Sequence, residues 1–155
     1  MKYRYKPTAP HVAAEVIALV CLAALIAVPV KFYGGAPDTI PTRFSFAGEP
    51  SKYADKSAFF TAFASHIFYF LMFTGYELIV IPKKGTENTA VTAPFCVMLA
   101  IAKAEVTAGL ALYEYCMLND AKIPGAVRIT LAAALVVTLA AGTVFCNRVL
   151  KRGAK

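Results

Sequence analysis

Residues 129–145 read ITLAAALVVTLAAGTVF and contain no charged side chain. A helix needs about 20 mostly apolar residues to cross the hydrocarbon core of a bilayer. Extended to the nearest breakers and polar residues, this stretch predicts a membrane span over residues 125–147. Pro124 and Gly125 stand at its start, where a turn of the backbone ends any preceding helix.

Three further stretches of this length carry almost no charge. The first, residues 11–32, contains Glu15 and, near its end, Pro29, where we expect a kink or the end of the helix. The second, residues 57–81, is rich in aromatic residues, and the third, residues 93–118, holds two charges near its middle. The sequence therefore predicts an all-α membrane protein with four transmembrane helices, in one integral membrane domain over residues 1–155.

The composition agrees with a membrane protein. The chain is 59% hydrophobic and 16% charged, against roughly 45–50% apolar and about 25% charged residues in soluble domains. This excludes a disordered chain and a small soluble enzyme. The four cysteines have no metal-binding spacing, the two histidines are too few for a metal cage, and no nucleotide-binding or nucleophile motif is present. We therefore predict no catalytic residues, no metal and no cofactor.

The distribution of basic residues predicts the orientation, because cytoplasmic loops carry an excess of Lys and Arg. With four spans, both termini and the connection between the second and third spans share one side. That side carries nine basic residues, against six in the opposite loops. We expect cytoplasmic N- and C-termini in the plasma membrane. The net charge of +7 then reflects topology and contact with anionic membrane lipid, so that no nucleic-acid partner is expected.

The longest connection is the predicted outer loop over residues 34–56, GGAPDTIPTRFSFAGEPSKYADK. It has the composition of an ordered segment. Pro41 holds the residue before it extended, residues 42–47 alternate polar with apolar, and Gly48 permits a turn. We expect the aromatic residues of the loop to pack on the membrane surface or on the mouth of the bundle, and Asp55 or Ser57 to cap the next helix.

The order of residues in this loop resembles a known pattern. An Ile-Pro-Thr is followed by an aromatic residue, a short gap to Gly, and an aromatic residue three positions before Lys. This is similar to the bacterial membrane family of domain of unknown function 1648 (DUF1648), which also forms the amino-terminal domain of SdpI-type immunity proteins. The positions of this chain that fall on the motif are Pro41, Thr42, Arg43, Phe44, Gly48, Tyr53 and Lys56.

The resemblance implies a four-helix layout of the same kind over most of the chain. Arg43 stands where the family usually has His, which removes the imidazole from this position. The best-known members protect a bacterium against a secreted toxic peptide and sequester a repressor at the membrane. We expect this chain to lack the second, carboxy-terminal membrane domain of those members.

Ionisable residues inside the predicted spans form a second candidate site, because an unpaired charge near the bilayer centre is costly. Lys103 and Glu105 lie two positions apart, about 200° around a helix, and cannot pair with each other. We expect Glu105 to face the bundle interior with His66. Lys103 is expected to pair with Glu77 or Glu15.

Two interpretations of this polar cluster remain open. It is either a proton-sensitive or ligand-binding core, or a hydrogen-bonded clasp that holds the second and third helices together. The small residues Gly109 and Ala102 near Glu105 favour the clasp, since they permit close helix approach. Glu15 and Glu114 lie nearer the ends of their spans and are expected to reach water.

Two classes of function follow. The first is a non-catalytic recognition, immunity or signalling module that acts through the 34–56 loop, with a peptide, a lipid or another membrane protein as partner. The alternative is a small proton-coupled transporter that uses His66, Lys103 and Glu105. Four helices are few for a carrier, so this alternative needs a homodimer, with Gly142 and the Ala-rich fourth helix at the contact. A membrane-embedded enzyme comes third, because no catalytic constellation is present.

Overall fold

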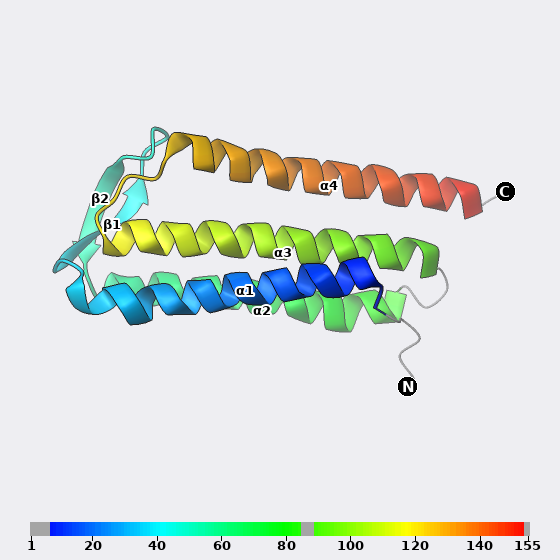
Figure 1. Ribbon diagram of the computed structural model, residues 1–155, viewed down its shortest axis with the longest axis horizontal. Helices are drawn as coiled ribbons and strands as arrows, with labels where there is room; N and C mark the ends of the chain where they lie inside the picture. The colour runs from blue at the N-terminus through cyan, green and yellow to red at the C-terminus, as the bar shows by residue number, and fades with distance from the viewer. Residues whose placement is uncertain (1–6, 85–88, 154–155) are drawn as a thin grey trace.

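In the computed structural model, which describes residues 7–84 and 89–153, four long helices lie side by side and a small β-hairpin closes one end (Figure 1). α1 begins, α2 ends, α3 begins and α4 ends at the other end of the bundle (Figure 1). The elements in chain order are α1 (Ala9–Phe32), the 3-10 helix η1 (Tyr33–Gly35), β1 (Thr39–Phe44), β2 (Pro50–Asp55), α2 (Ala58–Lys84), α3 (Thr89–Leu118) and α4 (Gly125–Gly153).

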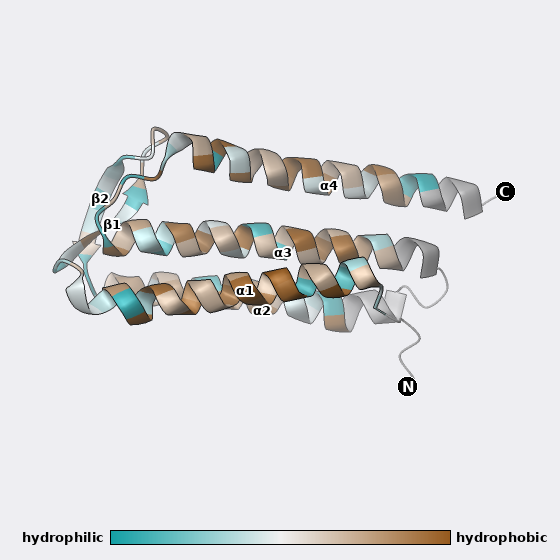
Figure 2. Cartoon of the chain, viewed as in Figure 1, coloured by the Kyte–Doolittle hydropathy of each residue, from teal (hydrophilic) through white to brown (hydrophobic). Residues whose placement is uncertain are grey.

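Each of the four α-helices contains a segment long and apolar enough to cross a membrane. Figure 2 shows hydrophobic residues along most of their length. The prediction of four helices long and apolar enough to span a membrane is confirmed, and their apolar segments lie within a few residues of the predicted bounds. The segments are Ala9–Gly35, Ala58–Leu78, Ala93–Leu118 and Gly125–Arg148.

Two prolines that were expected near helix ends lie inside helices. α1 runs through Pro29 and ends one turn later, where the Tyr33 N–H donates to the Pro29 carbonyl oxygen. Pro94 lies inside α3, which begins at Thr89. The basic residues Lys2, Arg4 and Lys6, which contribute to the predicted orientation, lie outside the described residues.

α3 is the central helix of the bundle. It contacts α1, α2 and α4, and half of its apolar segment is buried, against 6% of the segment in α4. Small side chains bring α1 and α3 together, since Ala14 and Ala18 on α1 and Ala100 and Ala104 on α3 are buried. Between membrane helices, where lipid competes for apolar surface, such close approach supplies packing energy. α3 is therefore positioned to present its polar residues to three neighbours.

α4 packs mainly against α3. Gly142 lies at this contact, because a Cβ added there would overlap the side chain of Met98. The glycine that we considered for a dimer contact thus takes part in packing within the chain.

The outer loop contains the one departure from an all-α fold in the described part of the chain. β1 and β2 pair antiparallel, with Thr39 opposite Asp55, Pro41 opposite Tyr53 and Phe44 opposite Pro50. An ordered loop is what the sequence predicts, but the two strands were not expected. The alternation of polar and apolar residues over 42–47 is the sequence signal of this hairpin.

A small apolar cluster anchors the hairpin to the helices. Ile40 and Phe59 are fully buried, and Met117 and Leu118 at the end of α3 pack with them. The Phe59 ring stacks on that of Phe63, with centroids 5.9 Å apart. The hairpin is therefore continuous with the core at this end of the bundle.

Candidate functional site

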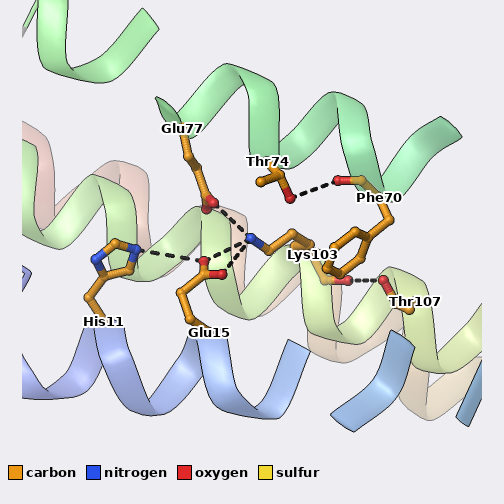
Figure 3. Close-up of polar contacts among 7 residues, drawn as sticks. All are labelled: His11, Glu15, Phe70, Thr74, Glu77, Lys103 and Thr107. Atoms are coloured by element: carbon orange, nitrogen blue, oxygen red, sulfur yellow. Dashed lines mark hydrogen bonds and ion pairs between the residues drawn. The ribbon is translucent and has the colours of Figure 1, made fainter. Parts of the chain in front are cut away.

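Lys103 lies where α1, α2 and α3 meet (Figure 3). Its Nζ donates to Oε1 and Oε2 of Glu15 on α1, at 2.8 and 2.7 Å, and to Oε2 of Glu77 on α2, at 2.8 Å. The Lys103 side chain is 1% exposed, that of Glu77 8% and that of Glu15 30%. The sequence offers Glu77 or Glu15 as the partner of this lysine, and the structure uses both.

Other side chains complete the surroundings of the ammonium group. His11 lies one turn before Glu15 on α1, with Nε2 3.7 Å from Glu15 Oε1. The Phe70 ring lies 5.4 Å from Nζ, a distance at which the ring face attracts a cation. Thr107 donates to the Lys103 carbonyl oxygen at 2.7 Å, and Thr74 donates to that of Phe70 at 3.0 Å (Figure 3).

His11, Glu15 and Glu77 also have the spacing of a metal site, since one ligand-type atom of each lies within 4.8 Å of the others. The Lys103 ammonium, however, is hydrogen-bonded to both carboxylates. The cation that these carboxylates hold in this structure is thus supplied by the chain itself.

A second polar pair lies nearer the hairpin. His66 Nδ1 on α2 is 2.7 Å from Glu114 Oε1 on α3, and the two side chains are 9% and 0% exposed. The Tyr113 ring contacts His66 edge to face, with centroids 5.9 Å apart. The expectation that His66 meets Glu105 is therefore wrong, and so is the expectation that Glu114 reaches water. Glu114 faces α2 and pairs there with His66, so its carboxyl group lies inside the bundle.

Glu105 faces α4 instead. Its Oε1 accepts a hydrogen bond from Thr138 Oγ1 at 2.9 Å, and its Oε2 is buried without a partner among the described residues. Glu105 lines an apolar cavity of about 420 Å³ between α1, α3 and α4, and Thr138 lines a neighbouring one of about 660 Å³. The predicted cluster of His66, Lys103 and Glu105 is thus three separate polar contacts.

Gly48 sits in the tight turn of the hairpin. The Ser45 N–H donates to Glu49 O at 2.7 Å and the Gly48 N–H to Ser45 O at 2.9 Å. Gly48 has a φ of +84°, and a Cβ there would overlap the carbonyl oxygen of Ile123. The Ile123 N–H in turn donates to Gly48 O at 2.9 Å. Glycine is required here both by the backbone conformation and by the close approach of the α3–α4 connection.

Tyr113 and Arg128 fix the hairpin to α3 and α4. The Tyr113 hydroxyl donates to Thr42 O at 2.8 Å, and its ring contacts that of Phe44 edge to face at 5.2 Å. Arg128 Nη1 donates to Ser45 O at 3.1 Å. These two residues were not expected at the site. Their only signal in the sequence is a polar group at the end of a predicted span.

Two motif residues hold the base and the outer side of the loop. Lys56 Nζ donates to Ala36 O at 3.0 Å and lies 4.6 Å from the centroid of the Tyr33 ring. The Tyr53 hydroxyl donates to Asp120 Oδ1 at 2.9 Å. This hydrogen bond to a carboxylate raises the pKa of Tyr53 above its usual range.

The start of α2 is capped by the acidic residue that the sequence offers for this role. Asp55 Oδ1 accepts the Ser57 backbone N–H at 2.8 Å. Hydrogen bonds from the Ser57 side chain and backbone lower the pKa of Asp55, because they favour its charged form.

Three side chains of the hairpin are exposed to solvent, although the ring of one of them, Phe46, has its centroid 5.7 Å from Cζ of Arg128. Phe46 in the turn is 98% exposed, and Arg43 and Lys52 are also exposed. Arg43 is paired with Lys52 across the strands, at an irregularity where the register shifts on both sides of Arg43. The motif residues Pro41, Gly48 and Lys56 thus build the hairpin, whereas Arg43 is the motif residue that it presents.

The four candidate spans define a multi-pass membrane protein. Residues 19–66 match the family described as Domain of unknown function (DUF1648), the family whose loop motif this segment resembles. The match runs from α1 through the hairpin into α2, so that it includes His66 but neither Lys103 nor Glu114. No curated protein and no solved structure matches the chain.

Proposed function

We propose that this protein is a non-catalytic recognition module of the bacterial plasma membrane, with cytoplasmic termini and an outer hairpin that binds an anionic partner. The surface involved consists of Arg43, Phe46 and Lys52, which we name the hairpin tip. The immunity and signalling roles associated with the family are two forms that such recognition would take. An anionic lipid headgroup and an acidic segment of a peptide or membrane protein share the chemistry that this surface would bind.

The observation that carries the proposal is the cross-strand pair of like charges. Arg43 and Lys52 are paired across the two strands at a point where the register shifts on both sides of Arg43, and like charges held close together destabilise a sheet. The acidic residue of the turn, Glu49, is paired with Lys122 on the α3–α4 connection. Both cations are therefore available to an external anion, whose binding would relieve their repulsion.

Rigidity of the hairpin supports the same conclusion. Main-chain hydrogen bonds tie Gly48 to Ile123, and side-chain bonds tie Thr42 to Tyr113 and Ser45 to Arg128. A surface held in this way loses little conformational entropy when it binds, which favours affinity. Phe46 beside the cations would add apolar contact with the partner or with the bilayer surface.

The absence of tryptophan from the sequence permits a direct test. Phe46→Trp places the single tryptophan of the variant at the hairpin tip, and excitation at the red edge of its absorption avoids the tyrosines. The full chain is reconstituted in phosphatidylcholine nanodiscs, and emission is measured after adding polyglutamate peptide or after replacing part of the lipid by phosphatidylglycerol. A shift with peptide indicates a peptide partner, and a shift with phosphatidylglycerol alone indicates a lipid headgroup.

The control variant carries Arg43→Gln and Lys52→Gln in the Phe46→Trp background, and we expect it to lose the shift. A tryptophan at Val137, an exposed position on α4, should not respond to the peptide. If neither anion shifts the emission, or if the double variant responds as strongly as its parent, the hairpin tip is not an anion-binding surface.

A proton-coupled transporter is the second candidate, and the buried ion pairs of α2 and α3 are the observation that favours it. Ionisable residues inside membrane proteins commonly mark ion or proton paths. Reconstituted vesicles with an internal pH dye test it. Flux that requires Glu77 and Glu114 supports transport, and proton movement no faster than in empty vesicles excludes it.

A further inference from the structure

The groups around Lys103 do not balance in charge. Lys103 contributes one positive charge, and Glu15 and Glu77 contribute two negative charges when both are ionised. A further titratable group at this site is His11, whose Nε2 lies 3.7 Å from Glu15 Oε1 on the same helix. α2 contributes the Phe70 ring and α3 the Thr107 hydroxyl, neither of which carries charge. A net negative charge at this depth is strongly unfavourable.

The three carboxylate oxygens that accept hydrogen bonds from Lys103 show where a proton would reside. Both oxygens of Glu15 accept hydrogen bonds from Nζ, and the Glu15 side chain is more exposed than that of Glu77. Glu77 uses only Oε2. Its Oε1 is buried and has no hydrogen-bond partner in the described part of the chain. A neutral carboxyl group leaves a smaller desolvation cost at this oxygen than a carboxylate does.

We propose that Glu15, Glu77 and Lys103 form a proton-binding site in which Glu77 carries one exchangeable proton. With the proton bound, the group of three is neutral. After its release, the site keeps one uncompensated negative charge between three helices. Proton binding is therefore a property of the bundle interior that is separate from recognition by the hairpin tip, and it holds whether or not the chain moves protons across the membrane.

A proton fits this position better than a metal cation does. The two cavities between α1, α3 and α4 are not lined by His11, Glu15, Glu77 or Lys103. The Lys103 ammonium already occupies the space between the carboxylates. A proton needs no space beyond Glu77 Oε1 itself.

The partial exposure of Glu15 gives the direction of exchange. Glu15 is 30% exposed and His11 13%, whereas Lys103 and Glu77 are nearly inaccessible. His11 and Glu15 both lie in the first two turns of α1, which begins at the end of the bundle opposite the hairpin (Figure 1). Protons would thus enter from that side, past His11 and Glu15, and the opposite pair His66 and Glu114 would not exchange with the same compartment.

Infrared difference spectroscopy of the full chain in nanodiscs tests the site, because a protonated carboxyl group has its own carbonyl band. The spectrum is recorded across a pH titration in normal and heavy water. We expect a band that disappears as the pH rises and that Glu77→Gln abolishes. The matched controls Glu105→Gln and Glu114→Gln should keep this band with an unchanged midpoint.

Glu77→Gln has the shape and the neutral charge of protonated Glu77, and the variant is expected to fold. Lys103→Met should shift the midpoint to higher pH, because removal of the ammonium makes a second negative charge harder to accept. A band that survives in Glu77→Gln, or one lost only in Glu105→Gln or Glu114→Gln, overturns the assignment. Loss of the band when sodium replaces choline at constant pH would show that a metal cation competes for the site, and would overturn the choice of a proton.

Discussion

His66 on α2 and Glu114 on α3 form a buried pair, with Nδ1 2.7 Å from Oε1. The same two helices are joined a second time by Glu77 and Lys103. On each helix the two polar residues are eleven positions apart, which is about three turns and returns to the same face. A single seam between α2 and α3 thus carries two polar contacts about 16 Å apart.

We expect Glu114→Ala to destabilise the bundle by about 1–2 kcal/mol. Breaking a buried ion pair in a soluble protein costs about 3–5 kcal/mol. Polar contacts between membrane helices reach only about 1.7 kcal/mol, because the unfolded chain in a bilayer also finds partners. Glu114→Gln should cost less, since its amide still bonds to the imidazole. Unfolding in detergent, with His66→Ala to complete a double-mutant cycle, measures the coupling. Additive effects of the two alanine variants would contradict the pair.

Lys103→Met should destabilise the bundle more than Glu77→Gln does. The methionine leaves the buried Glu77 and the partly exposed Glu15 without their cation, whereas the glutamine keeps a neutral hydrogen-bonding group beside Lys103. Part of the lost stability should be recovered when Glu15→Gln and Glu77→Gln are added to Lys103→Met.

Lys31→Met is the control for this experiment, because Lys31 is an exposed lysine at the end of α1. Its effect should remain within about 0.5 kcal/mol. Thermal unfolding in detergent measures all these variants. Equal losses in Lys103→Met and Lys31→Met would show that the buried charges contribute nothing to stability.

The sequence predicts the spans well because their signal is local. A run of about twenty apolar residues between helix-breaking residues can be recognised without knowing which helices pack against it. The partners of Lys103 could be predicted because it lies well inside a span and few acidic residues are available to it. The partner of Glu105 could not be predicted in this way. It depends on which helix packs against its face of α3, and the sequence does not determine that α4 and Thr138 lie there.

The burial of Glu114 has the same origin. Its position near the end of a span predicts contact with water, but Glu114 pairs with His66 of α2 and is fully buried. The contacts that hold the hairpin come from residues far away in the chain, such as Asp120 and Arg128. No spacing rule connects them to the motif, so the motif predicts an ordered loop but not its attachment.

Gly48→Ala should detach the hairpin from the α3–α4 connection. A side chain at a φ of +84° costs about 1–3 kcal/mol, and the added Cβ also overlaps the Ile123 carbonyl oxygen. The hairpin should become susceptible to protease in nanodiscs while the helices remain protected. Gly34→Ala is the matched control, because no atom lies within 4 Å of its added Cβ. Equal resistance of both variants would show that Gly48 is not needed for attachment.

Tyr53 should ionise at higher pH than it would without its partner, because its hydroxyl donates to the Asp120 carboxylate and this raises its pKa. A raised pKa means that the contact contributes stability while Tyr53 is protonated, below the pKa of an unfolded tyrosine. The contribution is lost as the pH rises through the folded pKa. The hairpin should therefore loosen in alkaline solution.

Asp120→Asn is the appropriate variant, because Asp120 has a φ of 46° and asparagine tolerates this left-handed conformation. It removes the negative charge but keeps an oxygen that accepts the hydrogen bond. The difference in tyrosinate absorbance between the wild type and Tyr53→Phe isolates Tyr53 from the other tyrosines. Asp120→Asn should move this ionisation to lower pH. An unchanged midpoint would mean that the carboxylate does not control Tyr53, and that the hairpin is held on this side by Lys122 and Glu49 instead.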